Sequence, residues 1–523
     1  MRRSKPTNVA GRLDRADGGD VQGGAGNAIR PSWLGVILVL IGLGTYANSF
    51  RGVFLFDDID AIILNNSIRS LWPITTVLNP PEQKPVAGRP ILNLTFAVNY
   101  AFGGVEPGGY HAVNIAIHLA AGLLLLGIVR RILLSDRARE RCGSRASTLA
   151  GLIALLWVVH PLQTESVTYI VQRAESLVGF FYLLTLYCVV RGIQQASGSG
   201  RGWFVGAVIA CGLGMASKEN MATAPLMALL LDRLFFSGSF RGMLRRRWAL
   251  HAALAATLLI LAALMAGGPR SMSAGFSTKG MTVADFAKSQ PLIILHYLRL
   301  SVWPHPLCLD YYWRIVNSWP AIVFPTLVLT AAAVASLWAI RRHPGVAYLG
   351  LFFFIVLAPT SSFVPLKDLA FEHRMYLPLA AVITLLVLLV DRAGDNVLKR
   401  APVSASAARG AKLAAAVLVA VIFAGMTIRR NMDYQSSIGM WNKVIAQRPD
   451  NARAISNLGV IYGILGRHEE AVETCRRAVT MDPNEGSAQA NLGKSLAKLG
   501  RYEEAIVEYR KALALDPDDT QVM

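Results

Sequence analysis

Long apolar stretches dominate this chain as far as residue 428, and they predict membrane-spanning helices. The first of them, 33–50, carries no charged residue. A helix needs roughly 20 mostly apolar residues to cross a bilayer, so the shorter stretches must extend into their flanks. Eleven spans are predicted: 33–50, 111–134, 147–160, 173–191, 203–216, 220–232, 248–267, 320–340, 346–360, 375–391 and 411–428.

Segment 286–302 is ambiguous, and basic residues decide how it is interpreted. It contains His296 and Arg299 and is followed by Trp-Pro. If it crossed the bilayer, Arg341-Arg342 and Lys399-Arg400 would move to the outer side, against the tendency of basic loops to stay inside. We therefore expect 286–302 to lie along the membrane interface, with the N-terminus cytoplasmic and the C-terminus extracytoplasmic.

Composition supports a multi-pass integral membrane protein. The 523 residues are 53% hydrophobic and 16% charged, whereas soluble domains carry about 25% charged residues. The net charge of +19 does not indicate nucleic-acid binding, because the excess lies in the apolar part, and the stretch from Arg429 onward has 13 basic and 13 acidic residues. The five cysteines lack CxxC or metal spacing. Residues 1–30 are predicted to be a disordered basic cytoplasmic tail.

The C-terminal stretch repeats with a period of 34 residues. Asn457-Leu458-Gly459 recurs as Asn491-Leu492-Gly493, and Asp482-Pro483 recurs as Asp516-Pro517. This is the tetratricopeptide pattern of paired helices, and an earlier half unit is marked by Trp441. We therefore divide the chain into a membrane part, 31–428, and a short α-solenoid, 429–523. The solenoid could bind a protein or peptide acceptor, or it could stabilise the chain or form an oligomer.

Ionisable residues gather in the segments predicted to face outward. Such residues at membrane depth are costly and suggest function. The first outer loop, 51–110, contains the adjacent acids of "FLFDDIDAIILNN". The candidate catalytic residues are Asp57 and Asp58, and the candidate substrate-binding residues are Arg89, His160, Glu165, Arg173, Lys218, Glu219, Glu372, His373 and Arg374.

These residue types suit group transfer from a lipid-linked phosphate. One of two adjacent carboxylates tends to have a raised pKa, which suits a general base, and Arg and Lys suit a phosphate. Plainer interpretations remain: the aspartates could cap a helix near Ile59, Glu372 and Arg374 could form a structural ion pair, and His160 could end a helix. No metal or cofactor is predicted, although paired acids could hold a divalent cation.

Several motifs in their order carry a family resemblance. These are "FLFDDIDAIILNN", "GRPILNLTFAVNYAFGG", "HPLQTESVTYIVQRAESL", "ASKEN", "FEHRMYLP" and the repeats. The chain resembles the transmembrane and tetratricopeptide-repeat O-mannosyltransferases, and more distantly the protein O-mannosyltransferases. All of these are polytopic glycosyltransferases of the C superfamily (GT-C).

The resemblance implies an inverting enzyme that moves a sugar, mannose in that family, from a polyprenyl or dolichyl phosphate to Ser or Thr of a protein. Asp57 and Asp58 match the family's acidic motif, Asp-Asp where relatives have Asp-Glu, and Asp57 is the expected base. Arg89 matches the Arg-Pro motif, and His373 interrupts the usual Glu-Arg pair. The location would be a bacterial inner membrane, or the endoplasmic reticulum in a eukaryote. The alternative is a flippase, transporter or non-catalytic scaffold for polyprenyl-linked sugars.

Overall fold

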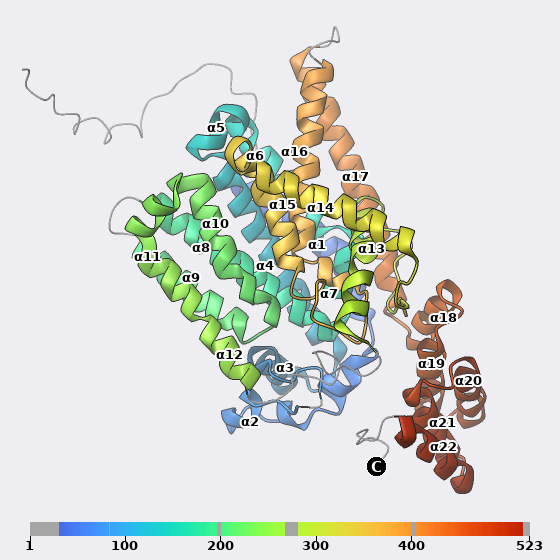
Figure 1. Ribbon diagram of the computed structural model, residues 1–523. Coiled ribbons are helices and arrows are strands. Elements are labelled where there is room, and N and C mark those ends of the chain that lie inside the picture. Colours follow the sequence, from blue (N-terminus) through green and yellow to red (C-terminus); the bar gives the residue numbers. More distant parts are fainter. Residues whose placement is uncertain (1–30, 83, 196–199, 267–280, 399–403, 516–523) are drawn as a thin grey trace, which may run out of the picture.

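The computed structural model describes residues 31–82, 84–195, 200–266, 281–398 and 404–515. Within these ranges the secondary structure is helical and contains no β-strand, which confirms the predicted all-α fold (Figure 1). The predicted basic tail, 1–30, lies outside the described residues.

The membrane part is a bundle of long helices with shorter ones at its two ends. The chain continues from Asp433 into the repeats. Its α-helices are α1 (Pro31–Tyr46), α2 (Ile74–Leu78), α3 (Pro90–Gly103), α4 (Pro107–Leu133), α5 (Asp136–Cys142), α6 (Ala146–Val158), α7 (Thr164–Val167), α8 (Arg173–Gln194), α9 (Arg201–Met215), α10 (Ala224–Leu231), α11 (Phe240–Ala256), α12 (Leu258–Ala266), α13 (Val283–Val302), α14 (Trp319–Arg342), α15 (Pro344–Leu357), α16 (Pro378–Leu398) and α17 (Ala405–Asp433).

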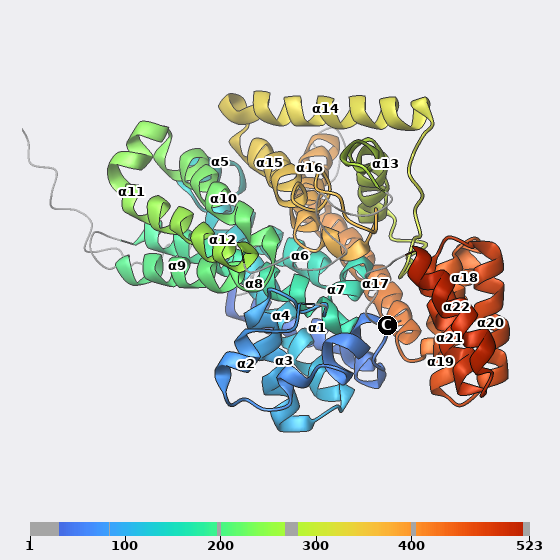
Figure 2. The same cartoon turned by 60° about the horizontal axis from the view of Figure 1, so that its bottom comes forward.

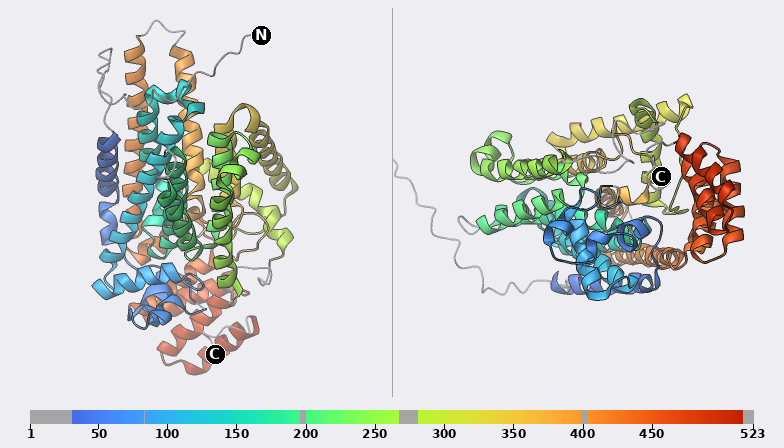
Figure 3. Two further views of the ribbon diagram at one scale, coloured as in Figure 1. Left: turned by 90° about the vertical axis from the view of Figure 1, so that its left-hand side faces the viewer. Right: turned by 90° about the horizontal axis from the view of Figure 1, so that it is seen from below.

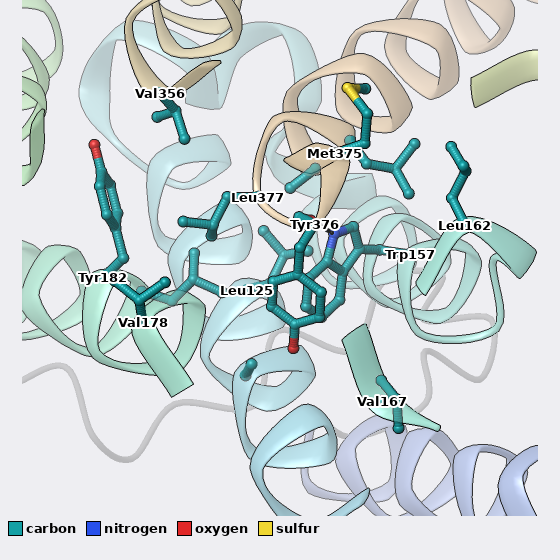
Figure 4. Close-up of a cluster of buried hydrophobic side chains, with 14 of the residues drawn as sticks. Leu125, Trp157, Leu162, Val167, Val178, Tyr182, Val356, Met375, Tyr376 and Leu377 are labelled. Carbon is teal, nitrogen blue, oxygen red and sulfur yellow. Dashed lines mark hydrogen bonds between the residues drawn. The ribbon is translucent and has the colours of Figure 1, made fainter. Parts of the chain in front are cut away.

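Helix α4 lies at the centre of the bundle, where it packs against α1, α6 and α8. Buried aromatic side chains join these helices to the start of α16 (Figure 4). The indole N–H of Trp157 donates to the Tyr376 carbonyl at 3.0 Å, and the Tyr376 hydroxyl lies 2.9 Å from His118 Nδ1. Because buried polar groups need such partners, these bonds fix the approach of the chain to α16.

In the described part of the chain, six helices are each long and apolar enough to cross a membrane: Ser32–Arg51, Pro107–Leu133, Ile170–Gln194, Phe240–Ala266, Trp319–Arg342 and Ser406–Asp433. A seventh would combine Gly143–Val158 with Pro161–Val167, which meet at a bend of 53°. Helices α9 and α15 are apolar but shorter. The predicted count of eleven spans therefore remains a prediction, as does the interfacial position of 286–302, which forms α13 against α14 and α16.

Different segments of the chain lie at the two ends of the bundle. Helix α5, the start of α11 and the loop ends of α16 and α17 lie at one end (Figure 3). There Arg145 pairs with Asp391 at 2.9 Å, and Arg247 pairs with Asp232 at 2.8 Å. Helices α2 and α3 and the C-terminal repeats lie at the other end (Figure 3). The first loop and the repeats thus share one end of the molecule, opposite several of the basic segments.

The repeats form a stack of antiparallel helices beside the end of α17 (Figure 2). They consist of α18 (Ser437–Gln447), α19 (Ala452–Ile464), α20 (His468–Met481), α21 (Gly486–Lys498) and α22 (Tyr502–Leu515). A Cβ at Gly459 would lie 2.4 Å from Cys475 Sγ, and one at Gly493 would lie 2.9 Å from the Tyr509 ring. The recurring glycine therefore sets how closely the two helices of each unit approach.

The shared end predicts the outcome of a labelling experiment. In a cysteine-free background, Trp72→Cys and Tyr502→Cys should react alike with a membrane-impermeant maleimide in sealed vesicles, because these exposed positions lie in the first loop and in the repeats. Arg139→Cys on α5 should show the opposite accessibility. Different labelling of positions 72 and 502 would contradict the arrangement.

Candidate functional site

Asp58 connects the first loop to the turn between α7 and α8. Its side chain is 1% exposed. The carboxylate accepts the Leu55 N–H at 2.9 Å on one oxygen and the Val171 N–H at 2.6 Å on the other. Its side chain does not cap the short π-helix Ile59–Ile63 that follows, so the capping interpretation is wrong for this residue. Asp58 instead holds two distant backbone segments together.

Asp57 has a different environment. Phe56, directly before it, has a φ of +45°, which is uncommon for a residue other than glycine. Asp57 is only half-buried, and its backbone N–H donates to the Tyr169 hydroxyl at 3.0 Å. The strained turn therefore buries Asp58 fully and leaves Asp57 half-buried.

The surroundings of Asp57 favour its protonated form. Burial, together with the charges of Asp368 and Asp60, raises the pKa of this carboxyl to about 7, whereas Arg453 and a hydrogen bond with Tyr169 oppose the shift. Lys84 pairs with Asp60 at 3.2 Å. A carboxyl that titrates near neutral pH suits a general base.

Glu165 on α7 and the turn before α16 meet beside this loop. Glu165 accepts the His373 backbone N–H at 2.9 Å and lies 2.9 Å from His373 Nδ1. Tyr169 lies within electrostatic reach of Asp57, Asp58 and Glu165, and Glu372 lies within reach of Glu165. The structure thus brings five predicted residues together around Tyr169, which the sequence analysis did not single out. We name these six residues the polar cluster: Asp57, Asp58, Glu165, Tyr169, Glu372 and His373.

Glu372 and Arg374 do not form the structural ion pair that the sequence allowed as a plainer interpretation. One Glu372 oxygen accepts the Cys308 N–H at 2.6 Å and the Tyr311 hydroxyl at 2.7 Å. Burial raises the pKa of Glu372 to about 7, with Arg430 opposing that shift. Arg374 donates to the Leu369 carbonyl at 2.7 Å and to the Asp368 carbonyl at 2.6 Å. Both side chains thus shape the turn that carries His373.

Most of the predicted cations already have partners. Arg89 pairs with Glu219 at 3.2 Å, and Lys218 pairs with Glu175 at 2.8 Å. Arg173 is fully buried and donates to Asn114, to Thr95 and to the Tyr110 carbonyl. It connects α8 to α4 and α3, which is a structural role.

His160 is a helix-end residue, as its plainer interpretation proposed. It is fully buried after α6. Its Nδ1 accepts the Leu162 N–H at 3.2 Å, and its Nε2 lies 3.1 Å from the Ser301 carbonyl on α13. With both ring nitrogens occupied by backbone groups, His160 holds the 161–163 turn against α13.

Arg430, at the end of α17, was missed by the sequence analysis. Its side chain is 5% exposed and pairs with Asp433 at 3.0 Å. The Nε and Nη2 atoms have no hydrogen-bond partner among the described residues, and neither has the Oε2 atom of Glu372. The final predicted span ended at 428, so Arg430 was assigned to the neutral repeat region. Its position just after the apolar stretch 411–428 is the sequence signal that could have identified it.

No group of three or more His, Cys, Asp or Glu side chains in the described part of the chain is placed to hold a metal ion. The polar cluster combines carboxyl groups with nearby guanidinium groups.

Two family models match parts of the chain. "Dolichyl-phosphate-mannose-protein mannosyltransferase" matches residues 114–265, and "Tetratricopeptide repeat" matches residues 450–518. Protein O-mannosyl-transferase TMTC4 from Homo sapiens is 25% identical over 517 residues, which cover 85% of this chain and 66% of the relative. The predicted resemblance to the transmembrane and tetratricopeptide-repeat O-mannosyltransferases is confirmed.

A second relative in this O-mannosyltransferase family is Protein O-mannosyl-transferase TMTC2 from Homo sapiens, which is 31% identical over 206 residues, or 38% of this chain and 23% of the relative. The chain thus spans 66% of the length of TMTC4 and less of TMTC2. A similar solved structure is ArnT from Cupriavidus metallidurans in the apo state, at 17% identity, a TM-score of 0.40, and coverage of 94% of this chain and 80% of that one.

The different environments of the two aspartates predict different effects on stability. Asp58→Asn should lower the thermal unfolding midpoint in detergent, because an amide nitrogen would face one of the two backbone N–H groups and leave it unpaired, at a cost of about 1–3 kcal/mol. Asp57→Asn, at a half-buried position, should leave the midpoint nearly unchanged. Equal midpoints for both variants would contradict the structural role of Asp58.

Proposed function

We propose that this protein is an inverting membrane glycosyltransferase that moves a sugar, mannose, from a polyprenyl or dolichyl phosphate to Ser or Thr hydroxyls of a protein. The observation that carries the proposal is the half-buried Asp57 carboxyl, with its raised pKa, beside the anchored Asp58. The printed names of the relatives support the type of reaction.

In this reaction Asp57 accepts the proton of the acceptor hydroxyl while the hydroxyl oxygen attacks the anomeric carbon. The bond from that carbon to the phosphate oxygen breaks, and the lipid phosphate leaves with the electron pair. Arginine suits the phosphate because its planar fork can donate two hydrogen bonds. Arg430, with two nitrogens that lack hydrogen-bond partners among the described residues, and Arg89, with one such nitrogen, offer donors for this role.

We also propose a sidedness and a role for the repeats. The N-terminus would be cytoplasmic, and the polar cluster and the repeats would face the extracytoplasmic side, where the repeats hold the protein acceptor. Support comes from the shared end of the first loop and the repeats (Figure 3), and from the basic residues near the opposite end.

Loss of the base should abolish transfer without loss of the protein. Asp57→Asn should lower the rate of sugar transfer from polyprenyl-phosphate mannose to a Ser/Thr-rich peptide by about 100-fold or more, the scale of general-base catalysis. The control is Asp136→Asn, at an exposed position on α5 at the opposite end. Near-normal transfer by Asp57→Asn, with normal expression and monodispersity, would remove Asp57 as the base.

The pKa of Asp57 predicts the dependence of transfer on pH. A base must be deprotonated, so kcat/KM should rise with pH and reach half its plateau near pH 7. Asp60→Asn removes a neighbouring negative charge and leaves Lys84 without its partner, so the pKa of Asp57 should fall and the midpoint should move to lower pH, by roughly half a unit. An unchanged midpoint, or a shift to higher pH, would contradict this assignment.

A further inference from the structure

The first helix of the repeat region contacts the turn that carries Asp57. Trp441 on α18 is 1% exposed. Its ring lies edge-on to that of Phe56, with centroids 5.5 Å apart and planes at 88°. Phe56 is the residue with the strained φ directly before Asp57. Nearby, the Val53 N–H donates to the Tyr434 carbonyl at 3.1 Å. The conformation of the Asp57 turn therefore depends on a side chain from the repeats.

Arg453 on α19 makes a second connection. It donates from Nε to Asp310 at 2.8 Å and from Nη2 to the other Asp310 oxygen at 2.6 Å, and it also pairs with Asp368. The side chains of Arg453 and Asp310 are 12% and 3% exposed. Asp368 and Arg453 are also both electrostatic neighbours of Asp57. One repeat residue thus joins two loops of the membrane part beside the polar cluster.

Residues 307–316, which we name the connecting segment, continue this link. The Cys308 N–H and the Tyr311 hydroxyl hold Glu372. In the same segment Asp310 binds Arg453, and the Tyr312 hydroxyl donates to Asp482 at 3.0 Å. The connecting segment therefore contacts the polar cluster on one side and the repeats on the other.

Packing joins the start of the repeat region to the membrane part. Met440, Trp441, Val444, Ala454 and Leu458 belong to the same buried apolar cluster as the membrane part. Further along, Val472, Cys475, Leu492, Leu496 and Ala505 form a smaller cluster of their own. Helix α18 is thus packed as part of the membrane part. Helix α19 packs on both sides, because its Ile455 also forms a cluster with Ala478 of α20 and Ala488 of α21.

We propose that α18 and α19 are a structural component of the catalytic site, in which Trp441 and Arg453 act as positioning residues for Asp57 and the 368–374 turn. This inference rests on the proposed function for its kinetic consequences. It assigns the repeat region two roles: the first part completes the site, and α20–α22 remain for the acceptor. Trp441 acts through Phe56, and Arg453 acts through Asp310 and Asp368.

The test compares substitutions at these two positions in the full-length protein. Trp441→Ala and Arg453→Met should each lower kcat for transfer of mannose from polyprenyl-phosphate mannose by about tenfold or more, because small misplacements of reacting groups are costly. KM for the acceptor peptide should stay within about twofold. Trp441→Phe should restore most of kcat, since an aromatic ring can still contact Phe56. The control is Asp136→Asn, at an exposed position on α5 at the opposite end of the bundle.

Hydrogen exchange gives a readout that does not depend on activity. In Trp441→Ala, amides of residues 54–58 should exchange faster than in the parent protein, while those of α4 and α8 stay unchanged. Trp441→Phe serves the same comparison if the alanine variant does not fold, with a smaller increase expected. No change at 54–58, or a rise in acceptor KM with kcat unchanged, would overturn the inference. Failure of the parent protein to transfer sugar would count against the proposed function, and the exchange result would still decide the positioning role.

Discussion

The site depends on one buried carboxylate that holds two backbone segments together. Asp58 joins residue 55 of the first loop to residue 171 of the turn before α8, and both of its oxygens are used. Burial raises the pKa of this carboxyl to about 8, and the two backbone N–H groups partly offset the cost of burying it. Because Asp58 is fixed in this way, Asp57 can remain half-buried while the loop keeps its conformation. Of the two adjacent acids, Asp58 thus has a structural role, and Asp57 is the candidate for the proposed reaction.

The buried cations also divide into those that hold the structure together and one that could bind a ligand. A charged group in a low-dielectric environment needs a partner, and Arg89, Lys218 and Arg453 have carboxylate partners. Their main effect in the present structure is to hold loops in place. Arg430 differs, because Asp433 binds only one of its three nitrogens, and the other two are buried without hydrogen-bond partners among the described residues. A guanidinium group in this state already bears the cost of desolvation, so an anionic ligand that reached it would gain a strong interaction.

Sequence patterns predicted the helical class, the repeats and most of the polar cluster, because each produces a local signal. The 34-residue period identifies the repeats, and Glu165 and His373 stood out as ionisable residues beside apolar stretches. Sequence could not show that His160 and Arg173 are buried structural groups, since their partners at Ser301 and Asn114 are far away along the chain. The connecting segment at 307–316 has no periodicity, and its importance arises entirely from tertiary contacts.

The contact between the repeats and the membrane part also could not be predicted from the sequence, and it explains how the half unit is stabilised. As a sequence pattern, Trp441 marks only an incomplete repeat unit, and the pattern does not identify the neighbour on which its apolar face is buried. A repeat helix needs such a neighbour to be stable, and here the membrane part supplies it through Phe56 and the apolar cluster around it. The contact that stabilises the half unit is also the contact that fixes the turn before Asp57. Since one interface serves both purposes, the solenoid cannot shift as a rigid body on the bundle without disturbing the carboxyl that the proposed reaction needs.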